Sequence, residues 1–331
     1  MKNNTRLRAP FPWFGGKRRV APEVWQGIGD VANFVEPFAG SLAVLLDRPT
    51  THIHSVETVN DVDAYICNFW RAVRADPEGV AREADRPVNE NDLLAMHVWL
   101  VNTGRERIAH LEADVDFYDV RVAGLWVAGI CMWIGSGWCS GHGPWTSVDG
   151  LLTKGTPGQG VNRQLPHLGN PGRGVNRKRQ ETDLMGYMQA LSDCLRRVRV
   201  CCGDWSRVVT DGALSHGQTV GIFLDPPYSE EIRDDTLYST DRTVADLSGD
   251  VRRWAIANGD NPRYRIVLCG YEGEHDMPAS WRVYAYSATR AYGQADSESA
   301  NSENRHKERL WFSPACLKGG TSAGLFEAVT P

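Results

Sequence analysis

The chain has 331 residues, of which 42% are hydrophobic and 23% charged, and its formal net charge is −5. This composition indicates a globular protein with one large domain or two smaller ones, long enough to bury a core without disulfide bonds. The negative balance excludes a protein that coats nucleic acid through bulk positive charge, but it leaves room for a local basic surface.

The N-terminal ten residues are polar and basic, without the apolar stretch of a signal peptide. The longest apolar run, 122–134, is too short to cross a bilayer. The eight cysteines form no C-x-x-C pair, so we expect reduced thiols in a cytoplasmic protein. A zinc set of Cys201, Cys202, His142 and His216 fits no recurrent spacing, and we expect no metal.

Residues 1–75 show the alternation of strands and helices that is typical of βα units. We expect a strand at 34–40 that ends in a glycine turn, a helix at 41–46, a strand at 52–59 followed by Asn60-Asp61, and a helix at 62–73. Asp61 or Asp63 would cap that helix, and Asp76-Pro77 opens another.

The middle of the chain has a different composition. Residues 90–145 are helical in pattern and rich in tryptophan, and we expect Trp126, Trp133, Trp138 and Trp145 to lie mostly in the core. Residues 154–179 hold six cations, six glycines and three prolines but no acid, which predicts a loop. A helix is expected at 181–198.

Strand patterns return in the last third of the chain, at 198–202, 220–224, 265–269, 281–286 and 309–312. Strands and helices at both ends around a different middle predict an α/β core with an insertion. We expect residues 1–75 and 198–331 to form that core and 76–197 to be the inserted domain.

One tetrapeptide, Asp225-Pro226-Pro227-Tyr228, follows the buried strand that ends at Leu224. The prolines fix the backbone just beyond the carboxyl end of the strand, where α/β sheets bind their ligands. A β-turn that caps the strand would also explain the tetrapeptide taken alone.

This tetrapeptide resembles catalytic motif IV of the amino-group DNA methyltransferases, and three other segments match the same enzymes. Residues 12–17, Pro-Trp-Phe-Gly-Gly-Lys, are similar to motif X of the Dam-like adenine methyltransferases; 34–41 are similar to motif I; Asn60-Asp61 with 68–71 are similar to the motif II region. The order X, I, insert, IV is that of the alpha group. The resemblance covers about residues 11–75 and 198–312.

The resemblance implies a Rossmann-like methyltransferase fold with an inserted target-recognition domain. It implies transfer of a methyl group from S-adenosylmethionine to the N6 amino group of an adenine flipped out of double-stranded DNA. Cytosine-N4 methyltransferases are the nearest alternative, but they more often have Ser at the position of Asp225; protein glutamine methyltransferases have Asn there. A catalytically silent DNA-binding protein is the alternative outside the enzymes.

The resemblance also implies roles for individual residues. The catalytic residues would be Asp225, Pro226, Pro227 and Tyr228: the Asp225 carboxylate and the Pro226 carbonyl accept the N–H groups of the base, and the Tyr228 ring stacks on it. The cofactor-binding residues would be Trp13, Gly16, Lys17, Glu36, Phe38, Gly40, Asp61, Asp204 and Trp205. A helix N-cap is the alternative for Asp61, and both roles can hold; a packing residue is the alternative for Trp205.

The sequence departs from the family pattern at two positions. Leu42 stands where motif I commonly has its second glycine, which puts the fit of the cofactor loop in doubt. Pro12 replaces the first lysine of motif X, which removes one charge contact.

The segment 154–179 is the expected DNA-binding element, with a solvated surface loop as the alternative. Its cations Lys154, Arg163, Arg173, Arg177, Lys178 and Arg179 would contact phosphates. Its amides Asn162, Gln164 and Asn176, with the adjacent Gln180, are of the type that reads adenine edges. The basic N-terminal segment 1–22 and the polar loop 289–309 are further candidates. No nuclease motif or obligate protein partner is expected, as in the stand-alone methyltransferases of phages and bacteria.

Overall fold

The computed structural model of the protein describes residues 7–13, 15–51, 56–134, 137–140, 145–148, 151–154, 166, 184–227, 244–286 and 308–318. Its α-helices are α1 (Ala21–Ile28), α2 (Ala64–Ala75), α3 (Pro77–Ala84), α4 (Glu90–Trp99), α5 (Arg105–Arg107), α6 (Val120–Met132), α7 (Leu184–Leu195) and α8 (Val244–Asn258). Its strands are β1 (Asn33–Glu36), β2 (Val56–Asp61), β3 (Trp145–Val148), β4 (Leu151–Lys154), β5 (Val198–Cys202), β6 (Val220–Leu224), β7 (Tyr264–Tyr271), β8 (Arg282–Tyr286) and β9 (Glu308–Phe312). Short 3-10 helices η1, η2 and η4 lie at Lys17–Arg19, Leu45–Asp47 and Trp205–Val208, and a π-helical turn lies at Leu100–Gly104.

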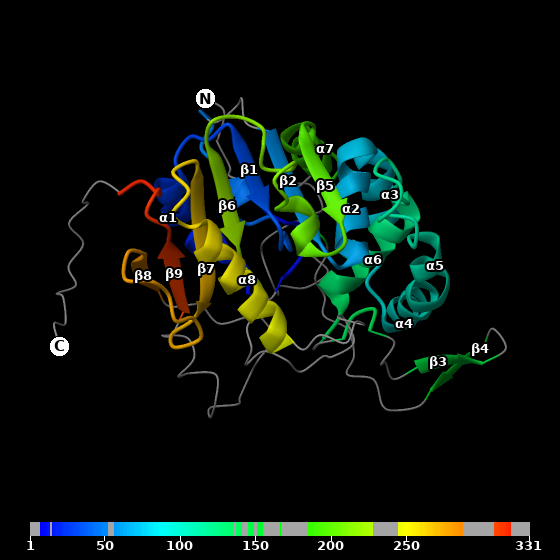
Figure 1. The fold of residues 1–331 in the computed structure, drawn as a ribbon. Coiled ribbons are helices and arrows are strands. Elements are labelled where there is room, and N and C mark those ends of the chain that lie inside the picture. Colours follow the sequence, from blue (N-terminus) through cyan, green and yellow to red (C-terminus); the bar gives the residue numbers. More distant parts are fainter. Residues whose placement is uncertain are drawn as a thin grey trace.

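Seven strands form one mostly parallel sheet in the order β5-β2-β1-β6-β7-β9-β8 (Figure 1). The pairs from β5 to β7 are parallel, whereas β9 is antiparallel to both β7 and β8. The chain order reverses between β1 and β6, which is the place where open α/β sheets bind their ligands. The prediction of a Rossmann-like α/β fold is confirmed.

The two faces of the sheet are covered by different helices. Val35, Ile222 and Leu268 point to the face that α8 covers, with Leu247 and Val251 of that helix. Side chains of the opposite alternation, such as Phe34 and Phe223, join the larger cluster with α1, α2 and α7. Both β1 and β6 are buried along their whole length; β6 therefore reads as an apolar run rather than as an alternating pattern, while β1 has the apolar pair Phe34-Val35 between two buried polar residues.

Helices of the middle segment gather at the β5 end of the sheet, where α3, α6 and α7 pack on α2 in the same hydrophobic cluster (Figure 1). Polar contacts reinforce this packing. The buried Arg71 of α2 donates to the carbonyls of Val200, Leu111 and Asp114 at 2.8 to 3.0 Å, and Asn68 exchanges two hydrogen bonds with the Asp119 backbone. The domain boundaries near 75 and 198 stay a prediction.

Tryptophan serves mainly for packing here. Trp126 is buried in the larger cluster, against which Trp133 and Trp138 pack. The Trp133 ring stacks on His97 with 4.8 Å between centroids. The side chain of Trp145 lies outside the described residues.

Two local expectations are wrong. The predicted helix at 41–46 is a turn followed by η2, because Leu42 has φ +54° and a left-handed residue cannot sit in a right-handed helix. Lys154 does not lie in a loop but ends β4, which pairs antiparallel with β3. The sequence signal for that hairpin, Asp149-Gly150 between two short runs, is the pair favoured in two-residue hairpin loops.

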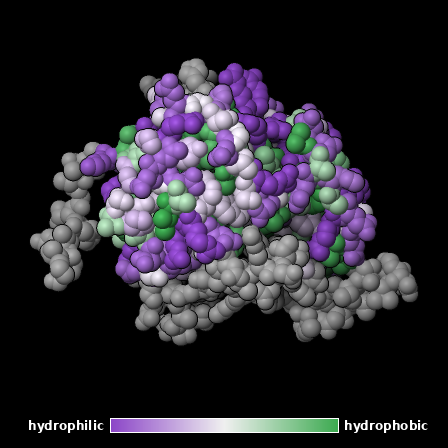
Figure 2. Space-filling view, viewed as in Figure 1, coloured by the Kyte–Doolittle hydropathy of each residue, from purple (hydrophilic) through white to green (hydrophobic). Residues whose placement is uncertain are grey.

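On the face shown in Figure 2, hydrophilic residues predominate and hydrophobic ones are scattered among them. None of the helices in the described part of the chain is long and apolar enough to cross a membrane.

The carboxyl ends of the five parallel strands define one edge of the sheet. Glu36, Asp61, Cys202 and Leu224 end β1, β2, β5 and β6, so Asp225 and the turns after β1, β2 and β5 meet at this edge. The antiparallel β9 begins at the same edge, with Glu308 opposite Tyr271 at the end of β7.

Candidate functional site

An ion pair between Lys17 and Asp225 lies at this edge. Lys17 Nζ is 3.1 Å from Asp225 Oδ1, and the two side chains are 6% and 19% exposed. The ammonium also donates to the Gly15 carbonyl at 2.8 Å. Two residues far apart in the sequence, in the segments that resemble motifs X and IV, are therefore in direct contact.

Burial and charge oppose one another at Lys17. Burial alone would lower the pKa of Lys17, but Asp225, with smaller contributions from Cys269 and Glu308, raises it above its ordinary value. Lys17 is therefore a permanent buried cation, and a buried charge of this kind needs paired carboxylates around it.

Glu36, the last residue of β1, is the second buried acid of the edge. Burial raises the pKa of Glu36 well above its ordinary value, and the nearby Asp225 and Asp61 raise it further. Its Oε2 atom is buried and has no hydrogen-bond partner in the described part of the chain. An unpaired buried polar atom at a ligand-binding edge indicates a group that a bound molecule could satisfy.

The turn after β1 is built around Gly40. Its φ is +45°, and a Cβ there would lie 2.6 Å from Trp13 Nε1, so only glycine fits beside the indole. The Gly40 N–H donates to Asp61 Oδ2 at 2.9 Å, and its carbonyl accepts from Trp70 Nε1 at 2.9 Å. The predicted residues Trp13, Gly40 and Asp61 are thus brought together.

Asp61 is fixed by backbone donors rather than acting as a cap. Its Oδ1 accepts from the Asp63 N–H at 3.0 Å, while the Asp63 side chain accepts from Tyr65 N and caps α2. Burial raises the pKa of Asp61, and the backbone donors, among them Asp63 and Gly40, partly offset this. Each carboxylate oxygen has further lone pairs, so Asp61 can still accept from a ligand hydroxyl.

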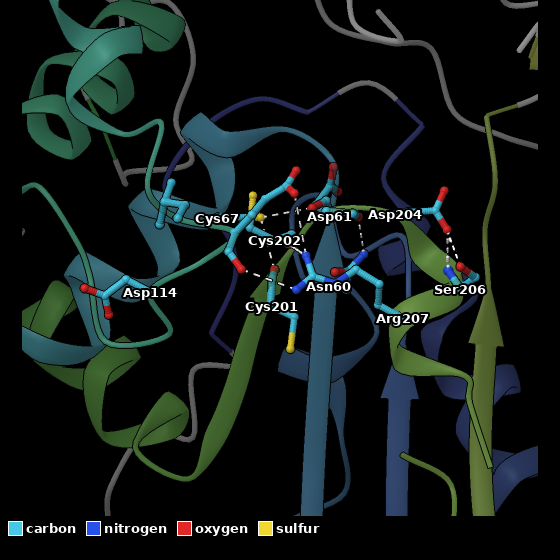
Figure 3. A network of polar contacts seen from close by, with 12 residues as sticks. Asn60, Asp61, Cys67, Asp114, Cys201, Cys202, Asp204, Ser206 and Arg207 are labelled. Atoms are coloured by element: carbon cyan, nitrogen blue, oxygen red, sulfur yellow. Dashed lines mark hydrogen bonds and ion pairs between the residues drawn. The ribbon is translucent and has the colours of Figure 1, made fainter. Parts of the chain in front are cut away.

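Asn60 ties three strand ends together. Its Nδ2 donates to the Pro37 carbonyl at 3.1 Å and to the Gly203 carbonyl at 2.9 Å, and the Gly203 N–H donates to the Asp61 carbonyl at 2.9 Å. Figure 3 shows this network where β2 and β5 end, with Asp204 and Ser206 to one side. Asn60 holds the loops after β1 and β5 at a fixed distance from Asp61.

An aromatic pair follows β5. The rings of Phe38 and Trp205 are stacked with centroids 6.1 Å apart and 26° between planes. The Trp205 Nε1 atom is buried without a partner in the described residues. Asp204 is exposed and caps η4, its carboxylate accepting from Ser206 N at 2.9 Å.

Taken along the edge, these groups form a row of changing polarity: aromatic rings, a carboxylate, a glycine turn, then a buried Lys–Asp pair. An aromatic base, a ribose diol and a charged amino-acid end would meet complementary groups in that order. Gly16 adds little by its size, since a Cβ there would make only ordinary contacts at 3.6 Å and beyond. The residues therefore fit an adenosine carrying a charged amino-acid end.

Several predicted residues cannot be placed. Tyr228, Arg163, Arg173, Arg177, Lys178 and Arg179 lie outside the described residues, and only the backbone of Lys154 is described. Pro226 is buried directly after Asp225, with Pro227 half-buried. In the part of the chain that the structure describes, no cluster of His, Cys, Asp or Glu is arranged to hold a metal ion.

Three residues of the site were missed from sequence. Asn60, next to Asp61, belongs to the motif II resemblance but has no predicted role, although a buried amide at a strand end is a usable signal. Trp70, whose indole holds the Gly40 carbonyl, reads as core from its helical spacing. Glu308 is far from the other motifs and gives no local signal.

Residues 13–97 match the family model of the D12 class N6 adenine-specific DNA methyltransferases. The matched segment contains Trp13, Lys17, Gly40 and Asp61, and it ends before β5 and β6. No curated protein matches the sequence significantly. The match agrees with the fold and with the resemblance of the sequence motifs. The similarity of residues 13–97 to the D12 class of N6 adenine-specific DNA methyltransferases, together with the fold, indicates a DNA methyltransferase enzyme.

Proposed function

We propose that the protein transfers a methyl group from S-adenosylmethionine to the N6 amino group of an adenine flipped out of double-stranded DNA. The observation that carries the proposal is the position of Asp225, directly after β6 and in an ion pair with the buried Lys17. An amine-activating carboxylate has to lie next to the cofactor-binding edge, and Asp225 does.

The cofactor would be held by the row of groups described above. Trp205 and Phe38 would border its adenine, Asp61 would accept from its ribose hydroxyls, and Lys17 with Glu36 would face its amino-acid end. When bound, S-adenosylmethionine supplies a methyl group activated by a positively charged sulfur.

The residues of the chain would have to activate a poor nucleophile, the exocyclic amino group of the target base. The lone pair of an exocyclic base amine is delocalised into the ring. If the Asp225 carboxylate and the Pro226 carbonyl each accept one N–H, the nitrogen is drawn toward tetrahedral geometry and its lone pair is released for attack. Such acceptors act by position and charge, without a covalent enzyme intermediate.

The amine of a paired adenine lies inside the duplex, so the base would have to leave the stack. Tyr228, which follows the two prolines in the sequence, would offer a ring for it to stack on. The cations of 154–179 would hold the backbone phosphates.

The test uses purified protein, duplex DNA and S-adenosylmethionine, with mass spectrometry of the digested nucleosides. We expect N6-methyladenine from the unaltered chain and a loss of ~10²–10³-fold for Asp225→Asn, as when one electrostatic group is removed from an active site. Asp211→Asn, at an exposed carboxylate, is the matched control and should keep full activity. N4-methylcytosine instead of N6-methyladenine would establish the alternative base, and full activity of Asp225→Asn would refute the mechanism.

A second test concerns DNA binding. Neutralising Arg173, Arg177, Lys178 and Arg179 together should weaken binding and reduce the slope of log K against log salt by up to ~3 to 4, since each phosphate contact contributes ~0.9. Binding with an unchanged slope would show that these cations do not contact phosphates.

A further inference from the structure

A buried acid outside the four sequence motifs lies at the same edge of the sheet. Glu308 is 6% exposed and is the first residue of β9. Because β9 is antiparallel to β7, it begins where the parallel strands end, and Glu308 is directly opposite Tyr271. The fold therefore brings a residue from near the C-terminus to the edge that holds Asp225.

Glu308 also lies on the same face of the sheet as Lys17. Residues directly opposite in a ladder share a face, and alternate residues along a strand do too, so Glu308 and Leu310 lie on the face of Tyr271 and Cys269. Leu310 and Cys269 belong to the cluster that α1 covers. Lys17 lies in η1, immediately before α1.

The electrostatics of two side chains agree with this placement. Lys17 has its pKa raised by Glu308 as well as by Asp225, although its burial works in the other direction. Tyr286, opposite Glu308 in the β8–β9 ladder, has a buried hydroxyl. Burial raises the pKa of Tyr286, and Cys269, Glu308 and Asp225 raise it further, so both acids are close to one hydroxyl.

We propose that Glu308 is a positioning residue for methyl transfer: its carboxylate shares the Lys17 ammonium with Asp225. The proposal rests on the proposed function of Asp225. A cation held by one carboxylate alone would draw that carboxylate into a tight neutral pair. With Glu308 as a second counter-charge, Lys17 is held from two sides and Asp225 keeps more of its negative charge for the N–H groups of the target base.

The decisive variant is Glu308→Gln, which keeps the size of the side chain and removes its charge. We expect kcat to fall by about 10- to 100-fold, the range seen when an outer group that orients an active-site ligand is removed. The KM for S-adenosylmethionine and the Kd for DNA should change by less than about threefold, and Glu308→Asp should recover part of kcat. If Glu308 acts through Lys17, Glu308→Gln combined with Lys17→Met should lose no more activity than Lys17→Met alone.

A matched control is Glu57→Gln. Glu57 is also a buried glutamate, 4% exposed, but it lies near the amino end of β2 and pairs with Arg48. This variant should lose stability in thermal unfolding and keep its kcat. A structural role of Glu308 would give the same result as Glu57.

Wild-type kcat in folded Glu308→Gln, a parallel loss of cofactor affinity, or an additive double variant would each overturn the proposal. If Glu308→Gln does not fold, Glu308→Asp decides: a lowered kcat with unchanged cofactor affinity supports the proposal, and a wild-type kcat overturns it. Absence of any methyl transfer by the unaltered chain would instead refute the proposed function.

Discussion

Substituting Gly40 by alanine would test the architecture of the site at its tightest point. Two costs apply there. At φ +45° an alanine is in the left-handed region, which costs about 1 kcal/mol. Its Cβ would also lie 2.6 Å from Trp13 Nε1, and overpacking of this kind costs about 1–3 kcal/mol. We therefore expect Gly40→Ala to lower the free energy of unfolding by about 2–4 kcal/mol.

Two other glycines separate these costs. Gly273 has φ +83° with open space around it, so Gly273→Ala should show the backbone cost alone, about 1 kcal/mol. Gly212 has neither a positive φ nor a neighbour within 4 Å, so Gly212→Ala should be neutral or slightly stabilising. Urea unfolding of the three variants measures the free energy of unfolding of each and so separates the backbone cost from the packing cost.

A binding measurement completes this test. Because Trp13 must move to admit the methyl group, and Gly40 N–H orients Asp61, the Gly40 variant should also bind S-adenosylmethionine at least about tenfold more weakly by titration calorimetry. The Gly273 and Gly212 variants should bind normally. A Gly40→Ala protein no less stable than Gly273→Ala, with unchanged cofactor affinity, would refute this reasoning.

Three further predictions concern local strain and pH. An alanine variant is usually more stable than a glycine variant, but Leu42 is buried with φ +54°, where glycine is unstrained. We therefore expect Leu42→Gly to be more stable than Leu42→Ala by about 1 kcal/mol in urea unfolding. The opposite order would mean that this positive φ is relaxed at no cost. Burial, with the neighbouring Asp61, raises the pKa of Asp63 to about 6, so its charged form destabilises the fold and stability is lost as the pH rises through 6. Asp63→Asn keeps an N-cap and should be more stable than the wild type by about 1 kcal/mol at pH 8, but not at pH 4. A variant as stable as the wild type at both pH values would contradict the raised pKa of Asp63. His97 stacks on Trp133, and burial lowers its pKa to about 4. The neutral imidazole therefore contributes its full share to the free energy of unfolding above pH 6.5, and this share is lost as the pH falls toward 4. His97→Gln should remove this part of the pH dependence of unfolding, and an unchanged profile would show that His97 does not cause it.

The sequence alone determined those features that depend on short-range patterns. The apolar run of β6 is recognisable because both faces of this strand are buried, and β1 contributes the shorter apolar pair Phe34-Val35. The capped start of α3 at Asp76 and the helical spacing of α2 are local as well. Trp13, Lys17, Gly40, Asp61 and Asp225 could be selected because each belongs to a motif of adjacent residues.

Only the tertiary structure decided how distant residues combine. No local sequence pattern indicates that Lys17 pairs with Asp225. The intervening 207 residues have to fold before Lys17 Nζ and Asp225 Oδ1 lie 3.1 Å apart. The left-handed Leu42 that ends the predicted helix at 41–46 follows from the turn in which it lies, since leucine itself favours helix. Glu308 reaches the edge that holds Asp225 for a topological reason: β9 runs antiparallel to its neighbours, so the start of that strand, rather than its end, lies where the parallel strands end.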